Sequence, residues 1–245
     1  MGHDAGGGDA GADPVTGTAA PPLTAEVTLF ARAAGYLLEG LSEVTDADLV
    51  RPTPCPGWDL RTLVLHVADA ADALAGLVTT GELVLPAPPR SEGLDAATLD
   101  AVAVAQHRTH RLLALLTSSD APGDDRAGRV TAAARGGAIE LAVHGWDVAT
   151  ACGSGRRMPP GLATRLLEAA TSLVDDSTRQ PLFGPPVPVP ATADPEDCLV
   201  AFLGRRPPVP SSASPSLRGE PGGGPVPGPA PSSRGVRGTG SSLSS

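Results

Sequence analysis

Apolar residues recur every three or four positions between residues 23 and 206, which is the spacing of one face of an α-helix. We predict helices over about 23–41, 60–78, 96–116, 129–152 and 160–174, with a short last helix at 195–204. Antiparallel helices joined by loops of modest length are typical of an up-and-down bundle. The sequence therefore predicts an all-α fold with a four-helix core, a fifth helix and a short extended C-terminal segment.

Proline and glycine mark the ends of these helices. Three prolines within residues 51–57 exclude a helix there, because proline fixes φ and lacks the backbone N–H. Asp59 follows this segment and is a typical N-cap for the next helix. The fourth predicted helix ends at Gly153 and Gly155, a C-cap signature. The proline-rich residues 182–190 are predicted to be extended.

The two ends of the chain differ from this pattern. Residues 1–22 lack periodicity and are predicted to form a disordered arm. From Pro207 to Ser245 the chain has 9 Pro, 8 Gly and 10 Ser among 39 residues, a composition that predicts a disordered tail. We therefore expect one folded domain over 23–206, with a loop at 81–93.

Composition supports a helical fold and excludes several functions. Aromatic residues make up only 2% of the chain, so the core is built from leucine, valine and alanine, which suit helices better than strands. The net charge of −9 disfavours binding to nucleic acid through phosphate neutralisation. All 18 basic residues are arginine, so no lysine is present for Schiff-base chemistry.

Cysteine content and apolar runs indicate the cellular setting. The three cysteines, Cys55, Cys152 and Cys198, are too few and too scattered for a disulfide framework or a cysteine-rich zinc site. No apolar run approaches the roughly 18 residues of a membrane helix, and the N-terminus lacks the basic and apolar parts of a secretory signal. We therefore expect a soluble, cytoplasmic protein that does not bind membranes.

The histidines are the first candidates for chemistry. His107 and His110 share one helical turn as H-x-x-H, a spacing that can chelate a metal. The helical angle, however, places both on the side opposite the apolar stripe of their helix. With Arg108 and Arg111 beside them, these histidines are predicted to lie on a solvated face.

His66, Glu140 and His144 lie instead beside the apolar stripes of their helices, where side chains point toward a neighbouring helix. Glu140 and His144 are four residues apart and so share one flank of a helix. Two imidazoles and a carboxylate, with a fourth position open, are the ligands of a catalytic zinc site, and other divalent metals accept them. A Glu–His pair at this spacing is also typical of a weak ion pair, so spacing leaves both interpretations open.

Two separated motifs resemble a known family. The first covers residues 45–66 and reads TDADLVRPTPCPGWDLRTLVLH; the second covers residues 140–147 and reads ELAVHGWD. Both are similar to the signatures of the mycothiol-dependent maleylpyruvate isomerase metal-binding family, which belongs to the DinB-like helical bundles. The segments 183–190 and 198–205 resemble the ends of shorter members, so the resemblance covers nearly the whole predicted domain.

This resemblance implies a DinB-like bundle that binds a divalent metal ion, most often zinc, through His66, Glu140 and His144. It also implies mycothiol as the thiol cofactor, and bundles of this kind commonly pair as homodimers. The isomerase itself carries a second, C-terminal domain that helps form its active site. This chain continues after Gly204 into the predicted tail, so the resemblance implies the metal-binding bundle and not the specific isomerase reaction.

Other residues of the motifs are candidates for supporting roles. Asp69 and Asp147 each lie three residues after a proposed ligand, where a carboxylate can accept the spare ring N–H and orient the imidazole. A solvated helix charge is the alternative for each. Trp58 and Trp146 are predicted to anchor packing near the site. Cys55 is expected to be a buried structural thiol, because no basic residue near it in the sequence would activate it.

Two functions of different classes follow from such a site. In the first, an enzyme, the metal binds a small thiol such as mycothiol and presents it as a thiolate to an electrophile, for thiol transfer or cis–trans isomerisation. The sequence shows no independent general base for this reaction. In the second, the bundle is a non-catalytic module that binds a metal or a small molecule. Acceptance of a thiol without a second substrate would distinguish the module from the enzyme.

Overall fold

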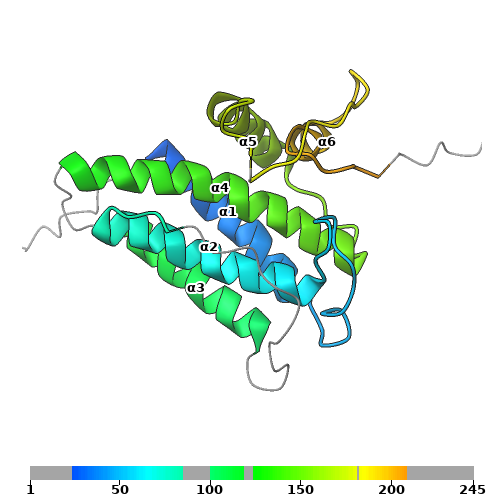
Figure 1. Ribbon diagram of the computed structural model, residues 1–245, viewed down its shortest axis with the longest axis horizontal. Coiled ribbons are helices and arrows are strands. Elements are labelled where there is room, and N and C mark those ends of the chain that lie inside the picture. Colours follow the sequence, from blue (N-terminus) through cyan, green and yellow to red (C-terminus); the bar gives the residue numbers. More distant parts are fainter. Residues whose placement is uncertain (1–23, 85–99, 119–123, 181, 209–245) are drawn as a thin grey trace, which may run out of the picture. The chain divides into compact units, whose positions relative to one another are not determined.

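The computed structural model describes residues 24–84, 100–118, 124–180 and 182–208, and the regular elements within these ranges are helices (Figure 1). They are α1 (Ala25–Leu41), α2 (Leu60–Thr80), α3 (Ala101–Thr117), α4 (Asp124–Cys152), α5 (Pro160–Leu173) and α6 (Pro195–Phe202). The predicted all-α fold is confirmed, and the helices follow one another in the predicted order.

The helix ends agree with the capping residues in the sequence. The carboxylate of Asp59 accepts a hydrogen bond from the Thr62 N–H at 2.8 Å, so the predicted N-cap of α2 is confirmed. α4 ends before Gly153, which adopts φ +65° as its C-cap signature predicts. α4 begins at Asp124, however, and not near residue 129. Its first turn is polar and has no apolar periodicity, so the hydrophobic pattern could not include it.

Several sequence predictions concern residues beyond those that the structure describes. The arm at 1–22, the tail from 209 onward and most of the predicted 81–93 loop lie outside the described residues. The predicted start of the third helix, near residue 96, lies outside them as well. The described helix α3 begins at Ala101, after its N-cap Asp100.

Four helices form a ring of neighbours around the core. α1 packs against α4 and α3, and α2 packs against α3 and α4. Figure 1 shows α5 and α6 beyond α4, on the side away from α2 and α3. α5 contacts α4, α1 and α6. The structure thus has the predicted four-helix core with a fifth helix on its outside.

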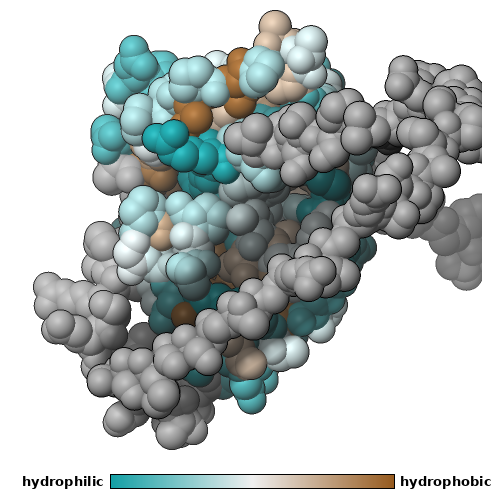
Figure 2. All heavy atoms as spheres, turned by 90° about the vertical axis from the view of Figure 1, so that its right-hand side faces the viewer, coloured by the Kyte–Doolittle hydropathy of each residue, from teal (hydrophilic) through white to brown (hydrophobic). Residues whose placement is uncertain are grey.

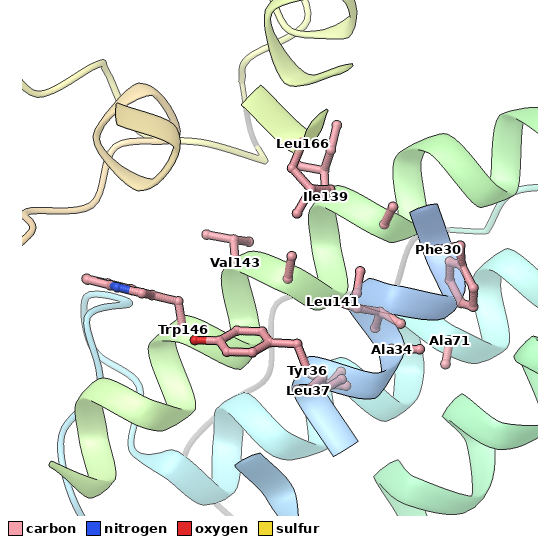
Figure 3. Packing of buried hydrophobic residues seen from close by; sticks show 14 of the residues in the cluster. Phe30, Ala34, Tyr36, Leu37, Ala71, Ile139, Leu141, Val143, Trp146 and Leu166 are labelled. Atoms are coloured by element: carbon pink, nitrogen blue, oxygen red, sulfur yellow. The ribbon is translucent and has the colours of Figure 1, made fainter. Parts of the chain in front are cut away.

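α1 and α4 approach each other closely at glycines of α4. A Cβ atom on Gly145 would lie 2.9 Å from the Tyr36 ring and 3.2 Å from the Leu37 Cα. A Cβ atom on Gly137 would lie 2.8 Å from the Phe30 ring. Figure 3 shows Tyr36 and Leu37 of α1 beside α4 in the core. Because interiors are close-packed, only a residue without a side chain fits at these two positions unless its neighbours move.

α2 has the length and apolar composition of a membrane-spanning helix, with 21 residues and a mean hydropathy of 1.4 over an 18-residue stretch of it. Half of this 18-residue stretch is buried inside the bundle. Leu63 and Val67, for example, have no exposed surface and belong to the core. On the described part of the face shown in Figure 2, apolar residues form only small patches among hydrophilic ones. These features are typical of a core helix.

The loop before α2 is tied to the end of α4. Arg51 donates hydrogen bonds to the carbonyl oxygens of Ala151 and Cys152, at 3.2 and 2.8 Å. A cation at this end of a helix also complements the helix dipole. The contact holds the proline-rich loop beside the last turns of α4, where the loop contributes Cys55 and Trp58 to the region described below.

The chain after α5 returns toward α4 through the predicted extended segment and α6. Arg179 is buried and donates to the carbonyl oxygens of Gly184 and Phe202, at 3.1 and 2.7 Å. Gly204 adopts φ +87°, and a Cβ atom there would lie 2.8 Å from the Gly184 Cα. These contacts fix the end of the segment, so that the next residue, Arg205, reaches a side chain of α4.

Candidate metal centre

Three side chains from two helices meet at the seam between α2 and α4. His66 comes from α2, and Glu140 and His144 come from α4. The Glu140 Oε1 atom lies 3.0 Å from His66 Nε2 and 3.1 Å from His144 Nε2. One ligand atom from each residue thus lies within 4.8 Å of the other two. The structure brings together the three residues that the sequence analysis selected as metal ligands.

The two helices position these side chains through their regular geometry. Glu140 and His144 are four residues apart, so they share one flank of α4. His66 lies on the side of α2 that faces α4, and its ring meets the His144 ring edge-on, with centroids 5.1 Å apart. The Trp58 ring also packs against His66, with ring centroids 4.8 Å apart. The cluster is therefore built on helices, and the loop before α2 supplies only a supporting wall.

The two sides of the cluster differ in exposure. The His66 and Glu140 side chains are 20% and 22% exposed, whereas that of His144 is 5% exposed. Among the described residues, the cluster is therefore open to solvent on the side of His66 and Glu140. The side of His144 is closed by the protein interior.

The second nitrogen of His144 faces a buried carboxylate. His144 Nδ1 lies 3.0 Å from Asp147 Oδ2, and the Asp147 side chain has no exposed surface. A carboxylate in this position orients the imidazole and determines which nitrogen faces the other way. Asp147 therefore has the contact that the sequence analysis expected. Asp69 does not, because it pairs with Arg108 at 2.8 Å on the surface.

Two further groups converge on Asp147. Arg205 Nη2 donates to Asp147 Oδ2 at 2.9 Å, and Arg205 Nε donates to Oδ1 at 3.4 Å. The half-buried Cys55 thiol donates to Oδ2 at 3.3 Å, and Arg205 Nη2 lies 3.5 Å from Cys55 Sγ. These partners offset the cost of burying the carboxylate. Cys55 thus has a structural hydrogen bond, but a basic group from a distant part of the chain lies beside it.

Burial and neighbouring charges shift the pKa values of these groups in opposite directions. Burial alone would raise the pKa of Glu140, but the imidazoles of His144 and His66 hold that pKa well below its usual range. Burial alone would lower the pKa of His144, but Glu140 and Asp147 hold it well above the ordinary histidine value. Burial also favours a raised pKa for Asp147, and here His144 and Arg205 lower it overall.

The hydrogen bonds of His144 indicate which tautomer a metal would require. A carboxylate accepts but cannot donate, so Nδ1 carries the proton where it faces Asp147 Oδ2. A metal would then bind at Nε2 and leave the Nδ1–H bond to Asp147 in place. The ring orientation is therefore set by the protein, independently of a metal.

The donor set fits a divalent transition metal. Neighbouring ligands of a tetrahedral zinc ion, with bonds of about 2.0–2.1 Å, lie roughly 3.3 Å apart. The distances of 3.0 and 3.1 Å from Glu140 to the two histidines are close to this value. Donor atoms of Cys55, His144 and Asp147 form a second group within 4.8 Å. There, however, Arg205 already neutralises Asp147, so the first group is the better cation site.

Other candidate residues lie outside the cluster. His107 and His110 are both exposed on α3, as predicted, and His110 Nδ1 lies 2.8 Å from the backbone carbonyl of Gln106. Trp146 is buried in the core, where Figure 3 shows it projecting from α4. Trp58 is half-buried and lines one side of His66 in addition to its packing role.

Arg205 is the residue of this region that the sequence analysis missed. It lies 58 positions after Asp147 in the chain and follows a different helix, so no spacing rule connects the two residues. The one signal in the sequence was the similarity of residues 198–205 to the ends of shorter family members. That similarity marked the segment as part of the domain but predicted no contact for Arg205.

Comparisons with known proteins agree with the motifs. Residues 30–149, which contain the whole cluster, match the family model described as the mycothiol maleylpyruvate isomerase N-terminal domain. Two uncharacterised proteins of Mycobacterium tuberculosis, from strains CDC 1551 / Oshkosh and ATCC 25618 / H37Rv, are each 31% identical to this chain over 167 residues. Each alignment covers 67% of this chain and 89% of the relative. No solved structure matches the chain.

Proposed function

Because this chain belongs to the family of the mycothiol maleylpyruvate isomerase N-terminal domain, we propose that it binds a divalent metal ion through His66, Glu140 and His144. Zinc is the first candidate, since two imidazoles and a carboxylate are ligands typical of catalytic zinc. We further propose that the metal activates a small thiol, and the family makes mycothiol the first thiol to test. The protein would then be a thiol transferase or an isomerase-like enzyme.

One observation carries this proposal, namely the position of a single carboxylate oxygen between two imidazoles. Glu140 Oε1 lies 3.0 Å from His66 Nε2 and 3.1 Å from His144 Nε2. A helical Glu–His pair alone would indicate only a weak ion pair. Here His66 joins the pair from a second helix, and Asp147 lies behind His144. This arrangement is typical of metal sites in which carboxylates orient the histidine ligands.

The residues of the chain divide the work of such a site. A metal held here would act as a Lewis acid that lowers the pKa of a thiol and supplies a thiolate near neutral pH. His66 and Glu140 line the solvent-facing side, where a small molecule would enter. His144 and Asp147 close the buried side and exclude water from it, and Trp58 supports the His66 ring.

A second candidate function is a non-catalytic module, and the surface has two open depressions away from the metal cluster where a small molecule could be sought. A pocket of about 310 Å³ is lined by residues that include Arg32 and Tyr36, and a pocket of about 280 Å³ by residues that include Glu26 and Arg135. Neither pocket includes a residue of the metal cluster. A small molecule bound in either pocket would not react at the metal and would make the protein a sensor or partner domain.

We also propose that the protein acts in the cytoplasm on a small thiol and does not act on nucleic acid or membranes. The net charge of −9 supports this, because phosphate binding requires a basic surface. Three free cysteines are compatible with a reducing compartment. The homodimer expected for such bundles belongs to this proposal, and light scattering of the purified protein tests it.

Elemental analysis by inductively coupled plasma mass spectrometry tests the metal site. We expect about one divalent ion per chain in the reconstituted wild type, and none in His66→Ala or His144→Ala. His107→Ala is the matched control, because it removes an exposed histidine of α3 and should keep the metal. A wild type that holds no metal, or ligand variants that retain it, would contradict the proposal.

Thiol activation needs a separate measurement. Replacement of zinc by cobalt gives the site a visible spectrum, and mycothiol should change this spectrum in the wild type. Consumption of an added electrophile would then identify an enzyme, and a spectral change without turnover would identify a binding module. An unchanged spectrum would contradict thiol activation while leaving the metal site in place.

A further inference from the structure

We propose that Arg205 is a positioning residue of the metal centre, which fixes the orientation of His144 through Asp147. This inference rests on the proposed metal site and adds a role for the C-terminal segment. Arg205 makes its hydrogen bonds and ion pair with Asp147, and only a weaker charge interaction with Glu140, so its main effect on the metal would act through Asp147.

Arg205 holds the Asp147 carboxylate at two points. Its Nη2 atom donates to Oδ2 at 2.9 Å and its Nε atom donates to Oδ1 at 3.4 Å. The Arg205 side chain is only 10% exposed and that of Asp147 is fully buried, so water has little access to these bonds. A guanidinium that binds both oxygens of a carboxylate fixes the plane of the carboxylate as well as its position.

The fixed plane matters because the same oxygen binds the proposed ligand. Asp147 Oδ2, which accepts from Arg205, also accepts from His144 Nδ1 at 3.0 Å. Rotation of the carboxylate would therefore move the acceptor away from Nδ1 and release the imidazole. With the acceptor held, His144 Nε2 stays directed at Glu140, which is the position that a metal would require.

The C-terminal segment in turn holds Arg205. The backbone N–H of Arg205 donates to the Val200 carbonyl at 2.8 Å, and Arg205 Nη1 donates to the Leu203 carbonyl at 3.1 Å. Gly204 permits this geometry, because glycine readily adopts its φ of +87° and a side chain there would clash with the Gly184 backbone. A chain of contacts thus runs from the end of α6 through Arg205 to the buried side of the metal cluster.

A purely structural ion pair would behave differently from a positioning residue. Loss of a structural pair would lower the free energy of unfolding and leave the metal affinity of the folded protein unchanged. Loss of a positioning residue would weaken metal binding by the folded protein, and the loss would depend on Asp147. The two roles are therefore separated by metal affinity and by a double-mutant cycle.

The test compares zinc affinity, measured by competition with a chromogenic chelator, in wild type, Arg205→Met, Arg205→Lys, Asp147→Asn and the two double variants. We expect Asp147→Asn and Arg205→Met each to weaken zinc binding by about tenfold or more, the range for outer partners of a ligand. Arg205→Lys should recover part of the affinity, because one charged donor remains. Neither Arg205 substitution should weaken binding further in the Asp147→Asn background.

Arg108→Met is the matched control, since it removes an Arg–Asp pair of similar length, 2.8 Å, on the surface between α2 and α3. It should leave zinc affinity unchanged, and the cobalt spectrum should change in Arg205→Met but not in Arg108→Met. If Arg205→Met does not fold, the Lys variant in the two backgrounds gives the same cycle. Equal zinc affinity in wild type and Arg205 variants, or additive effects with Asp147→Asn, would overturn this inference alone. A wild type without zinc binding would overturn the proposed function and this inference together.

Discussion

The two sides of α4 face different neighbours and carry different kinds of residue. Toward α1, Gly145 presents no side chain, and the Tyr36 ring packs against the helix backbone. Toward α2, Glu140 Oε1 lies 3.0 Å from His66 Nε2 and 3.1 Å from Nε2 of its own helix neighbour His144. His144 and Gly145 are adjacent in the sequence, so the two environments lie within one turn of the same helix.

One helix thus separates packing from chemistry. Close contact on the α1 side holds α4 in place and contributes to stability. The fixed helix then presents two side chains, four residues apart, to a histidine of α2. Substitutions on the α1 side should therefore act mainly on stability, and substitutions on the α2 side mainly on metal binding.

The largest effect is expected from Glu140→Gln on the α2 side. Loss of the charged ligand should weaken zinc binding by more than about a hundredfold, since even outer partners of a ligand account for about 10–100-fold. The free energy of unfolding of the metal-free protein should fall by only about 1 kcal/mol, because the amide still offers one oxygen acceptor. Chelator competition and urea denaturation measure the two quantities. A variant that keeps its zinc affinity would show that the α2 side of α4 does not control metal binding.

Gly145→Ala on the α1 side should have the opposite profile. The added methyl group would meet the Tyr36 ring at 2.9 Å and the Leu37 backbone at 3.2 Å. We expect a loss of about 1–3 kcal/mol in the free energy of unfolding, as for other overpacked sites, with zinc still bound. Gly136→Ala is the matched control, because Gly136 is an exposed residue of α4 with open space around it. That control should stabilise the helix by up to about 1 kcal/mol.

The smallest effect is expected at the N-caps of α2 and α3. Asp59 caps α2, which carries His66, and Asp100 caps α3, which carries no residue of the cluster. Replacement of either by alanine should lower the free energy of unfolding by about 1 kcal/mol. Only Asp59→Ala should also lower zinc affinity, because it loosens the start of the helix that presents His66. Equal zinc affinity in both variants would show that the cap does not affect the site.

The fold was largely predictable because its core helices are amphipathic. The period of apolar residues and the cap at Asp59 were sufficient for α2. The first turn of α4, from Asp124, was missed because it is polar, and its helical state follows from continuation of the helix and not from burial. Periodicity likewise could not show that Gly145 and Tyr36 touch, since the contact joins two helices far apart in the chain.

The site was predictable only in part. Spacing placed Glu140 and His144 on one flank, but the approach of His66 depends on how α2 packs against α4, which no local pattern encodes. The resemblance to a family supplied that pairing. Arg205 was not predicted, because its contact with Asp147 depends on the path of the chain after α5 and on the close approach of Gly204 to another backbone segment.

The contact between His66 and Glu140 joins residues 74 positions apart in the chain. A metal ion bound to both would close a loop of this length and so act as a reversible cross-link. A ligand that binds only the folded chain stabilises it by mass action, by about 2.7 kcal/mol at a free concentration of 100 times Kd. The resistance of this protein to heat and to proteases would then rise and fall with the supply of free metal in the cell.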